Sequence, residues 1–204
     1  MNVDSARADL AFMRALVEPS DGWLKQFGET YSAAGLCYCV QMLMHGGQFF
    51  GVFPAEGPVA LAIGLGPTAV FLALLAWIIR RNRMQASGGA TAKAVGSVFG
   101  AVGLTNLALV LIIGSVAWRW HSLSTWLIYP CVVMVLQGLA WLVAYMLRRI
   151  AWHALVALGW FATGLGMAAF IDVPGGYVIA AGAGMFACML VPGLYMLRQS
   201  RRAA

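Results

Sequence analysis

The stretch Tyr31–Phe53 reads YSAAGLCYCVQMLMHGGQFFGVF, and its 23 residues include no Asp, Glu, Lys or Arg. At about 1.5 Å per residue, a helix of this length is roughly 35 Å long, enough to cross the hydrocarbon core of a bilayer. Its polar side chains recur at spacings of three and four residues and share one side of the helix: Cys37, Gln41, His45 and Gln48. Amide and imidazole groups are costly against lipid, so we expect this side to face protein, with the other helices packed around it.

Composition indicates a helical membrane protein. Of the 204 residues, 62% are hydrophobic and 10% are charged, whereas a soluble domain has about 25% charged residues. The apolar runs are long and continuous rather than alternating, which favours helices over a barrel. The sequence therefore predicts an all-α integral membrane protein in which a bundle over residues 31–204 has six transmembrane helices, at about 31–53, 57–79, 94–117, 124–147, 151–171 and 177–197.

The distribution of charge predicts the orientation in the membrane. With the N-terminus inside, twelve of the thirteen Lys and Arg residues are cytoplasmic and only Arg119 is external, so the net charge is +7 inside and −1 outside. This strong positive-inside pattern predicts an N-in, C-in protein of the inner (plasma) membrane. The basic residues then serve topology and anionic lipid headgroups, so we expect membrane lipids and not nucleic acid as partners.

Residues 1–30 carry two short apolar patterns separated by Pro-Ser-Asp-Gly at 19–22. The alternation of acidic and basic residues is not that of a signal peptide. The second pattern, with Trp23 and Phe27 on one face, predicts a short helix distinct from the span that follows. We expect this cytoplasmic amphipathic segment to lie on the membrane surface; the alternative is that it binds a cytoplasmic protein partner.

Short similar sequence motifs at the ends of alternate spans suggest an internal repeat. The second, fourth and sixth spans end alike, at Trp77–Arg80, Tyr145–Arg148 and Tyr195–Arg198, and the first two motifs end 45 residues beyond Gly35 and Gly103. This spacing favours three tandem helical hairpins. The alternative is convergence, because aromatic belts and cytoplasmic Arg recur at the inner end of any span.

Glycines at small-xxx-small spacing give two of the spans a flat face. The residues are Gly96, Gly100 and Gly103 in the third span and Gly182 in the sixth. Such faces allow the backbones of two helices to approach closely. We therefore assign these glycines to helix packing and expect that the protein can form a homo-oligomer.

An amide or hydroxyl group lies within about two residues of the centre of five of the six predicted spans. No Asp, Glu, Lys or Arg lies deep in a span, which argues against a strongly charged substrate. We therefore expect a midplane polar pocket that binds or translocates a small neutral, amphipathic or lipid-like molecule. The candidate ligand-binding residues are Gln41, His45, Gln48, Asn106 and Gln137. The alternative is that these groups only bond one helix to another.

The sequence carries no pattern typical of an enzyme, a metal site or a cofactor site. Cys37 and Cys39 point about 200° apart on a helix, so they cannot bind one ion together. The three histidines lie at unmatched depths, which disfavours bis-histidine haem, and neither GxSxG nor a pair of intramembrane acids is present. We expect no catalytic residue, metal or cofactor. The alternative function is a non-catalytic regulator or accessory subunit that acts through its N-terminal segment.

Overall fold

The structure is a computed structural model that describes residues 21–82 and 89–203, and the regular structure in these ranges is entirely helical. The first apolar pattern of the N-terminal segment lies outside the described residues. The elements are α2 (Asp21–Phe49), α3 (Gly57–Asn82), α4 (Ala90–Trp120), α5 (Leu123–Arg148), α6 (Ala151–Ala169), α7 (Pro174–Met185), the π-helix η1 (Phe186–Leu190) and α8 (Val191–Ala203).

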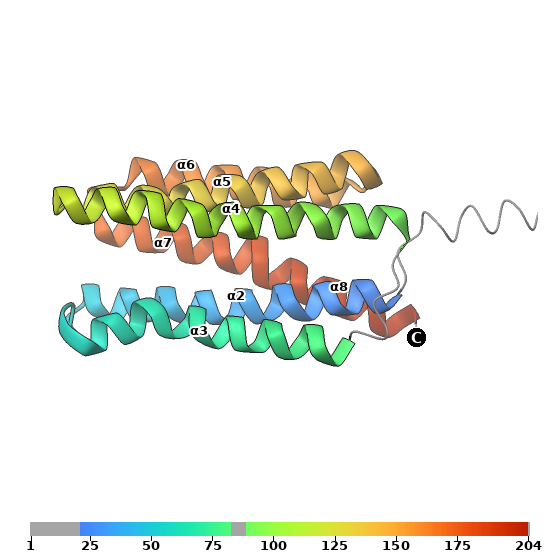
Figure 1. Ribbon diagram of the computed structural model, residues 1–204, viewed down its shortest axis with the longest axis horizontal. Helices are drawn as coiled ribbons and strands as arrows, with labels where there is room; N and C mark the ends of the chain where they lie inside the picture. Colours follow the sequence, from blue (N-terminus) through green and yellow to red (C-terminus); the bar gives the residue numbers. More distant parts are fainter. Residues whose placement is uncertain (1–20, 83–88, 204) are drawn as a thin grey trace, which may run out of the picture.

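The helices lie lengthwise beside one another in an elongated bundle (Figure 1). In the described ranges, five helical rods are long and apolar enough to cross a membrane: α3, α4, α5, α6 and the continuous rod from Pro174 to Arg202 that contains α7, η1 and α8. These are the features of a multi-pass membrane protein, which confirms the predicted class. α2 has 29 residues, but the amide and imidazole groups among them make it less apolar than these five rods.

The first helix begins earlier than predicted. We expect from the sequence a separate surface helix after the break at 19–22, with Trp23 and Phe27 on one face, but α2 is continuous from Asp21 to Phe49. Trp23 and Phe27 pack against the buried core of the bundle, not on its outer surface. The helix also stops four residues before the predicted end, because the chain turns at Gly51, whose φ of +73° suits glycine.

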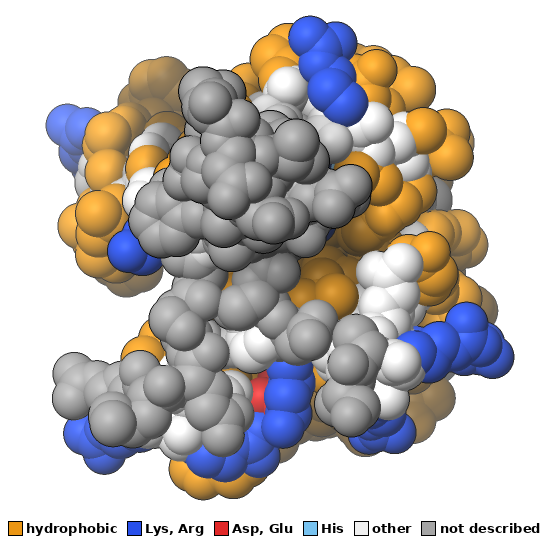
Figure 2. Space-filling view, turned by 90° about the vertical axis from the view of Figure 1, so that its right-hand side faces the viewer, with side chains coloured by type: hydrophobic (Ala, Val, Ile, Leu, Met, Phe, Trp, Pro, Cys, Tyr) orange, Lys and Arg blue, Asp and Glu red, His pale blue; other side chains and the backbone are white. Residues whose placement is uncertain are grey.

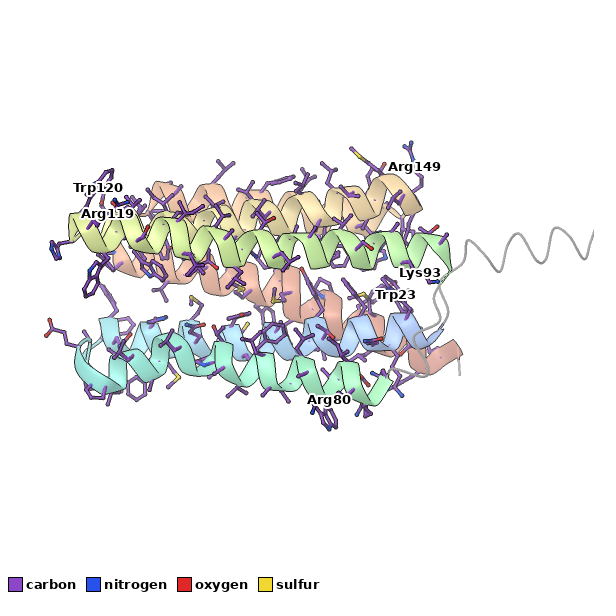
Figure 3. All side chains as sticks on the ribbon, in the orientation of Figure 1. Trp23, Arg80, Lys93, Arg119, Trp120 and Arg149 are labelled. Carbon is purple, nitrogen blue, oxygen red and sulfur yellow. The ribbon has the colours of Figure 1, made fainter. Side chains whose placement is uncertain are left out.

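The two ends of the bundle differ in charge. Of the ten Lys and Arg residues in the described ranges, nine lie at the end where α2 begins, which we call the basic end; Arg119 lies at the opposite end beside Trp120 (Figure 3). Figure 2 looks onto the basic end and shows Lys and Arg side chains around its rim. The distribution matches the asymmetry used above to predict orientation.

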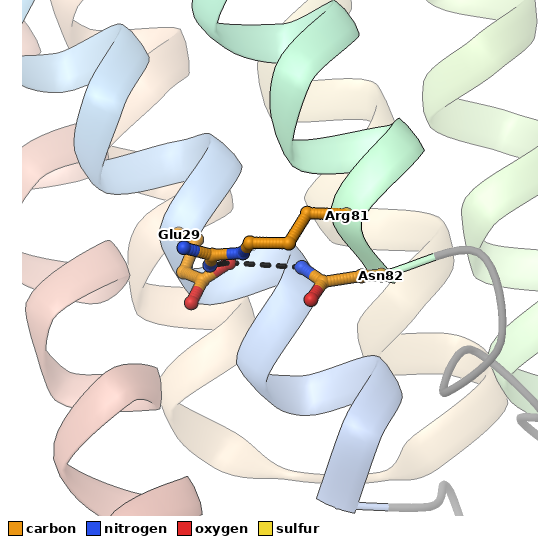
Figure 4. A network of polar contacts seen from close by, with 3 residues as sticks. All are labelled: Glu29, Arg81 and Asn82. Carbon is orange, nitrogen blue, oxygen red and sulfur yellow. Dashed lines mark hydrogen bonds and ion pairs between the residues drawn. The ribbon is translucent and has the colours of Figure 1, made fainter.

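The α2–α3 hairpin is closed at the basic end by a carboxylate. Glu29 Oε2 on α2 lies 2.6 Å from Nη2 of Arg81 on α3 and accepts a hydrogen bond of 2.9 Å from Nδ2 of Asn82 (Figure 4). Asn82 is 3% exposed, so its amide needs such a partner. This carboxylate is therefore committed to α3.

The last rod connects two sides of the bundle. α7 packs against both α6 and α2, whereas α8 packs mainly along α2, so the rod crosses the bundle obliquely (Figure 1). The π-helix η1 lies at the crossing, where Pro192 has no amide hydrogen to donate to the carbonyl of Cys188 and a wider turn avoids the clash of its ring. Since α3 and α5 are unbroken, the third hairpin differs from the first two, and the threefold repeat stays a prediction.

The contact of α2 with the end of η1 and with α8 depends on glycine. A Cβ on Gly35 would lie 2.6 Å from the backbone nitrogen of Leu190, and a Cβ on Gly193 would lie 2.5 Å from the backbone nitrogen of Ser32. Gly28 makes a similar approach one turn nearer the basic end. We call these residues the α2–α8 seam. The two backbones touch there because no side chain separates them.

The glycines assigned to helix packing divide into two groups. Gly182 contacts α2, since its Cβ would lie 3.4 Å from Cβ of Met42. On α4, by contrast, a Cβ on Gly100 or Gly103 would meet open space, and one on Gly96 would reach a single side-chain atom at 3.9 Å. This face therefore makes no close helix contact among the described residues, and its use in a homo-oligomer stays a prediction.

Aromatic side chains fill the core near the basic end. Tyr31 on α2 is 5% exposed, and its hydroxyl oxygen accepts hydrogen bonds from the indole N–H groups of Trp141 on α5, at 2.5 Å, and Trp160 on α6, at 3.1 Å. Phe27 and Phe99 meet edge to face beside it, with ring centroids 4.8 Å apart. One hydroxyl oxygen thus joins three helices.

The seam predicts that Gly35→Ala lowers the free energy of unfolding by about 1–3 kcal/mol, because the added Cβ must push two backbones apart. Reversible unfolding in detergent micelles, followed by circular dichroism, measures this loss. Gly100→Ala is the control, since its Cβ enters open space. An equal loss in both variants would attribute the effect to helix flexibility and not to the seam.

Because two indoles share the hydroxyl of Tyr31, removal of this one oxygen should lower the stability of the protein strongly. Tyr31→Phe leaves two buried indole N–H groups unpaired, at about 1–3 kcal/mol for each. Tyr195→Phe is the control, because that hydroxyl is on an exposed residue and accepts only from Gln199 on the same helix. The same unfolding measurement should show the Tyr31 variant less stable than the control; equal stabilities would show that the indoles find other acceptors.

Candidate functional site

The five residues predicted to bind a ligand do not converge on one pocket. Gln41, His45 and Gln48 lie on α2, Asn106 on α4 and Gln137 on α5. The structure gives those on α2 partners within the α2–α3 hairpin, and the other two lie on the neighbouring pair of helices, α4 and α5.

Gln41 joins α2 to α3. It is 9% exposed, and its Nε2 donates a hydrogen bond of 2.8 Å to the carbonyl of Gly64. Gly64 lies in the turn before Pro67, although the carbonyl that Pro67 leaves without a helical donor is that of Ile63. The amide of Gln41 thus makes a hydrogen bond between two helices, the role that was the alternative to ligand binding.

His45 and Gln48 form a local chain that reaches the α2–α3 connection. His45 Nδ1 lies 2.7 Å from Oε1 of Gln48, and Nε2 of Gln48 donates to the carbonyl of Pro54 at 2.8 Å. Because Nε2 of Gln48 is the donor, its Oε1 accepts, and the hydrogen is on Nδ1 of His45. This chain holds the turn at the end opposite the basic end.

Asn106 and Gln137 lie at a similar depth on the antiparallel α4–α5 pair. The contact between Phe99 and Trp141, whose ring centroids are 5.7 Å apart, fixes the register of the two helices. This register puts Asn106 level with Met134 and therefore about one helical turn from Gln137. We call Asn106 and Gln137 the amide pair.

Each member of the amide pair has a buried oxygen without a hydrogen-bond partner. The atoms are Oδ1 of Asn106 and Oε1 of Gln137. An unpaired buried carbonyl oxygen costs about 1–3 kcal/mol, so native structures usually supply a donor from protein, water or a ligand. The partner that suits these two oxygens is a hydroxyl, an amine, an amide or water. The amide pair is thus the part of the predicted polar layer with unused binding capacity.

The interior of the bundle is less filled near the amide pair than at the basic end. On α4, Val95 and Val102 are 2% and 7% exposed, but Asn106, Val110 and Ile113 on the same face are only half-buried. α3 packs along α2, and α4 packs along α5, without extended contact between α3 and α4. The backbones of α3 and α4 therefore do not pack along each other.

One feature was missed by the sequence analysis. Trp23, Arg148 and His153 line a small crevice at the basic end. Trp23 had been placed on the membrane surface, and His153 had been considered only as a haem ligand. The signal was the short interval between Arg148, at the end of one span, and His153, in the first turn of the next, which puts both at one end of the bundle.

Metal-binding groups do not gather in the part of the chain that the structure describes. No three His, Cys, Asp or Glu side chains there are close enough to hold an ion. The four cysteines are free thiols, and Cys131 and Cys188 are buried among apolar side chains. No metal or cofactor is assigned to this structure.

Comparison with known proteins gives no relative. No protein-family model, no curated protein and no solved structure matches this chain. The case for a function therefore depends on the residues themselves.

Proposed function

We propose that this chain is a six-span membrane protein that binds, or moves across the membrane, a small neutral, amphipathic or lipid-like molecule at the amide pair. The observation that carries the proposal is the presence of two buried, unpartnered amide oxygens, on Asn106 and Gln137, at a similar depth on adjacent helices. In this proposal α2 is the sixth span, its polar side covered by α3 and the last rod. The basic end faces the cytoplasm, as the positive-inside rule requires.

The surroundings of the amide pair favour a ligand with one polar end. The two oxygens can only accept hydrogen bonds, so the ligand must bring a hydroxyl, amine or amide donor. α4 also carries exposed apolar side chains on its outer face, among them Leu104 and Leu107, at 73% and 59%. A molecule that enters between α3 and α4 would keep its apolar part in lipid while its polar end reaches the amides.

The other predicted ligand residues have a supporting role in this proposal. Gln41 joins α2 to α3, and the chain from His45 through Gln48 holds the connection between them. These bonds keep the α2–α3 hairpin fixed on one side of the proposed entry between α3 and α4. His45 is then a structural hydrogen-bonding group, and the proposal assigns it no gating protonation.

The alternative is a regulator or accessory subunit that acts through the N-terminal segment. Residues 1–20 lie outside the described chain, and Trp23 and Phe27 are packed within the bundle. No contact in the described residues favours this alternative. We retain the regulator or accessory subunit as the function to be inferred if the purified protein carries no bound ligand.

Native mass spectrometry of the protein, gently extracted with its membrane lipids, tests the ligand proposal. We expect a reproducible small-molecule adduct that Asn106→Leu and Gln137→Leu remove, because each change deletes one acceptor. Gln41→Leu should keep the adduct while it lowers stability by roughly 0.6–2 kcal/mol, the contribution of a hydrogen bond between membrane helices. A bare bundle, or an adduct that survives both pair variants, would contradict the proposal and favour the alternative.

The proposed orientation is tested with introduced cysteines in a variant whose four native cysteines are replaced by alanine. Ser124→Cys, at the end opposite the basic end, should react with a membrane-impermeant maleimide in intact cells, because Ser124 is exposed. Arg202→Cys, at the basic end, should react only after the cells are opened. The reverse pattern would place the basic end outside, and the cysteine-free protein measures background labelling.

A further inference from the structure

A small crevice lies at the basic end, separate from the amide pair. It encloses a cavity of about 10 Å³, which is room for one water-sized group. It is lined principally by Trp23, Phe27, Phe99, Trp141, Arg148 and His153. In Figure 3, Trp23, Lys93 and Arg149 all lie at the basic end.

His153 presents an unused nitrogen at this crevice. The side chain is 2% exposed, yet its Nδ1 has no hydrogen-bond partner. The ring is fixed, because its other side bonds to the backbone of Ala144 and it packs against Trp141 and Trp152, at centroid distances of 5.3 and 4.2 Å. A buried nitrogen held in this way is expected to meet a polar group of a ligand or a water.

Arg148 is the second polar group of the crevice. It is the last residue of α5 and is half-buried, with its guanidinium carbon 5.7 Å from the centre of the Trp23 ring. The carboxylate of Glu29 is bound to Arg81, and no ion pair involves Arg148 in the described ranges. A guanidinium carries five N–H donors in a fork that matches phosphate or carboxylate oxygens. Arg148 is therefore equipped for an anion that the described residues do not supply.

The surroundings add positive potential. α6 begins at Ala151, so the positive end of its dipole points toward the basic end; the backbone N–H of His153 donates to the carbonyl of Ile150, and no side chain caps the first turn. Nine Lys and Arg residues of the described ranges lie at this end. An anion near Arg148 and His153 would be favoured by both contributions.

We propose that the crevice binds the phosphate of an anionic lipid headgroup. The phosphate lies at the mouth of the crevice, where the guanidinium of Arg148 holds its oxygens. Because the other ring nitrogen of His153 bonds to the backbone of Ala144, Nδ1 is an acceptor, and one water in the cavity donates one hydrogen bond to Nδ1 and the other to a phosphate oxygen. Because the whole phosphate does not fit inside, the site suits a group presented from the membrane surface, where the basic end meets the headgroups.

Titration of lipid into delipidated protein in a neutral detergent, followed by native mass spectrometry, tests this site. The probes are phosphatidylglycerol and the zwitterionic phosphatidylcholine. We expect one phosphatidylglycerol to bind more tightly than phosphatidylcholine. Arg148→Gln should weaken that binding by about tenfold to a hundredfold, the value of a hydrogen bond to a charged group. Equal binding of the two lipids would overturn the proposal.

Arg149→Gln is the matched control, because Arg149 is the next residue, carries the same charge and is exposed. It should change the affinity by less than about twofold, since an exposed, solvated charge contributes little. If it weakens binding as much as Arg148→Gln, the lipid binds to a diffuse basic surface and the proposed site is wrong. Competition with inorganic phosphate identifies the source of the anion: displacement would assign the crevice to free phosphate, and retention of the lipid would support the headgroup.

Arg148→Lys keeps the measurement decisive if Arg148→Gln does not fold. Lysine keeps the charge near Trp23 but loses the planar fork. We expect folded protein, judged by its size-exclusion profile, with an affinity for phosphatidylglycerol between those of the wild type and Arg148→Gln. An affinity equal to that of the wild type would show that charge alone acts and would overturn the geometry proposed for the phosphate.

Discussion

The contact of the α2 backbone with the backbones of η1 and α8 is the constraint on which the rest of the fold depends. Gly35 and Gly193 allow an approach that no side chain would permit, so the end of the last rod is fixed to the first helix. The beginning of the same rod packs against α6, and the rod must therefore cross the bundle, with η1 at the crossing. The crossing brings α2 beside α5 and α6, where the hydroxyl of Tyr31 meets the two indoles.

Two kinds of polar group occur inside this bundle, and they differ in whether the protein satisfies them. Gln41 donates to the carbonyl of Gly64 on α3, and Gln48 donates to the carbonyl of Pro54 in the connection between α2 and α3. Asn106, Gln137 and His153 instead each keep an atom without a partner while that atom is buried. The first kind stabilises the fold, and the second is where the physical argument for binding is strongest, since a buried unpaired group is unfavourable until something pairs with it.

Most of the architecture could be predicted from hydropathy, because length and apolar composition decide which segments can cross a bilayer. The start of α2 could not be predicted in this way. Trp23 and Phe27 form an apolar helix face, and the sequence does not tell whether that face meets lipid or other aromatic rings. Sequence spacing also does not tell which glycines lie at a contact between helices. The regularly spaced glycines on α4 face open space, whereas Gly28, Gly35 and Gly193 lie where α2 contacts the last rod, far away in the sequence. The sequence likewise does not tell that Gln41 has a hydrogen-bond partner in the bundle while the side-chain oxygen of Gln137 has none; the structure shows this because it places Gly64 beside Gln41.

The π-helix has a consequence for how this chain tolerates changes in length. One additional residue in a helical turn rotates everything after it by about 100° relative to an uninterrupted α-helix. With η1 in place, Gly193 faces Ser32 and Met196 is buried at 2% exposure. Rotated back by that angle, a different set of side chains would face α2, and the contact between backbones would be lost. The number of residues between Pro174 and Gly193 is therefore coupled to the rotation of α8, so natural variation in chain length should be confined to the connections between helices.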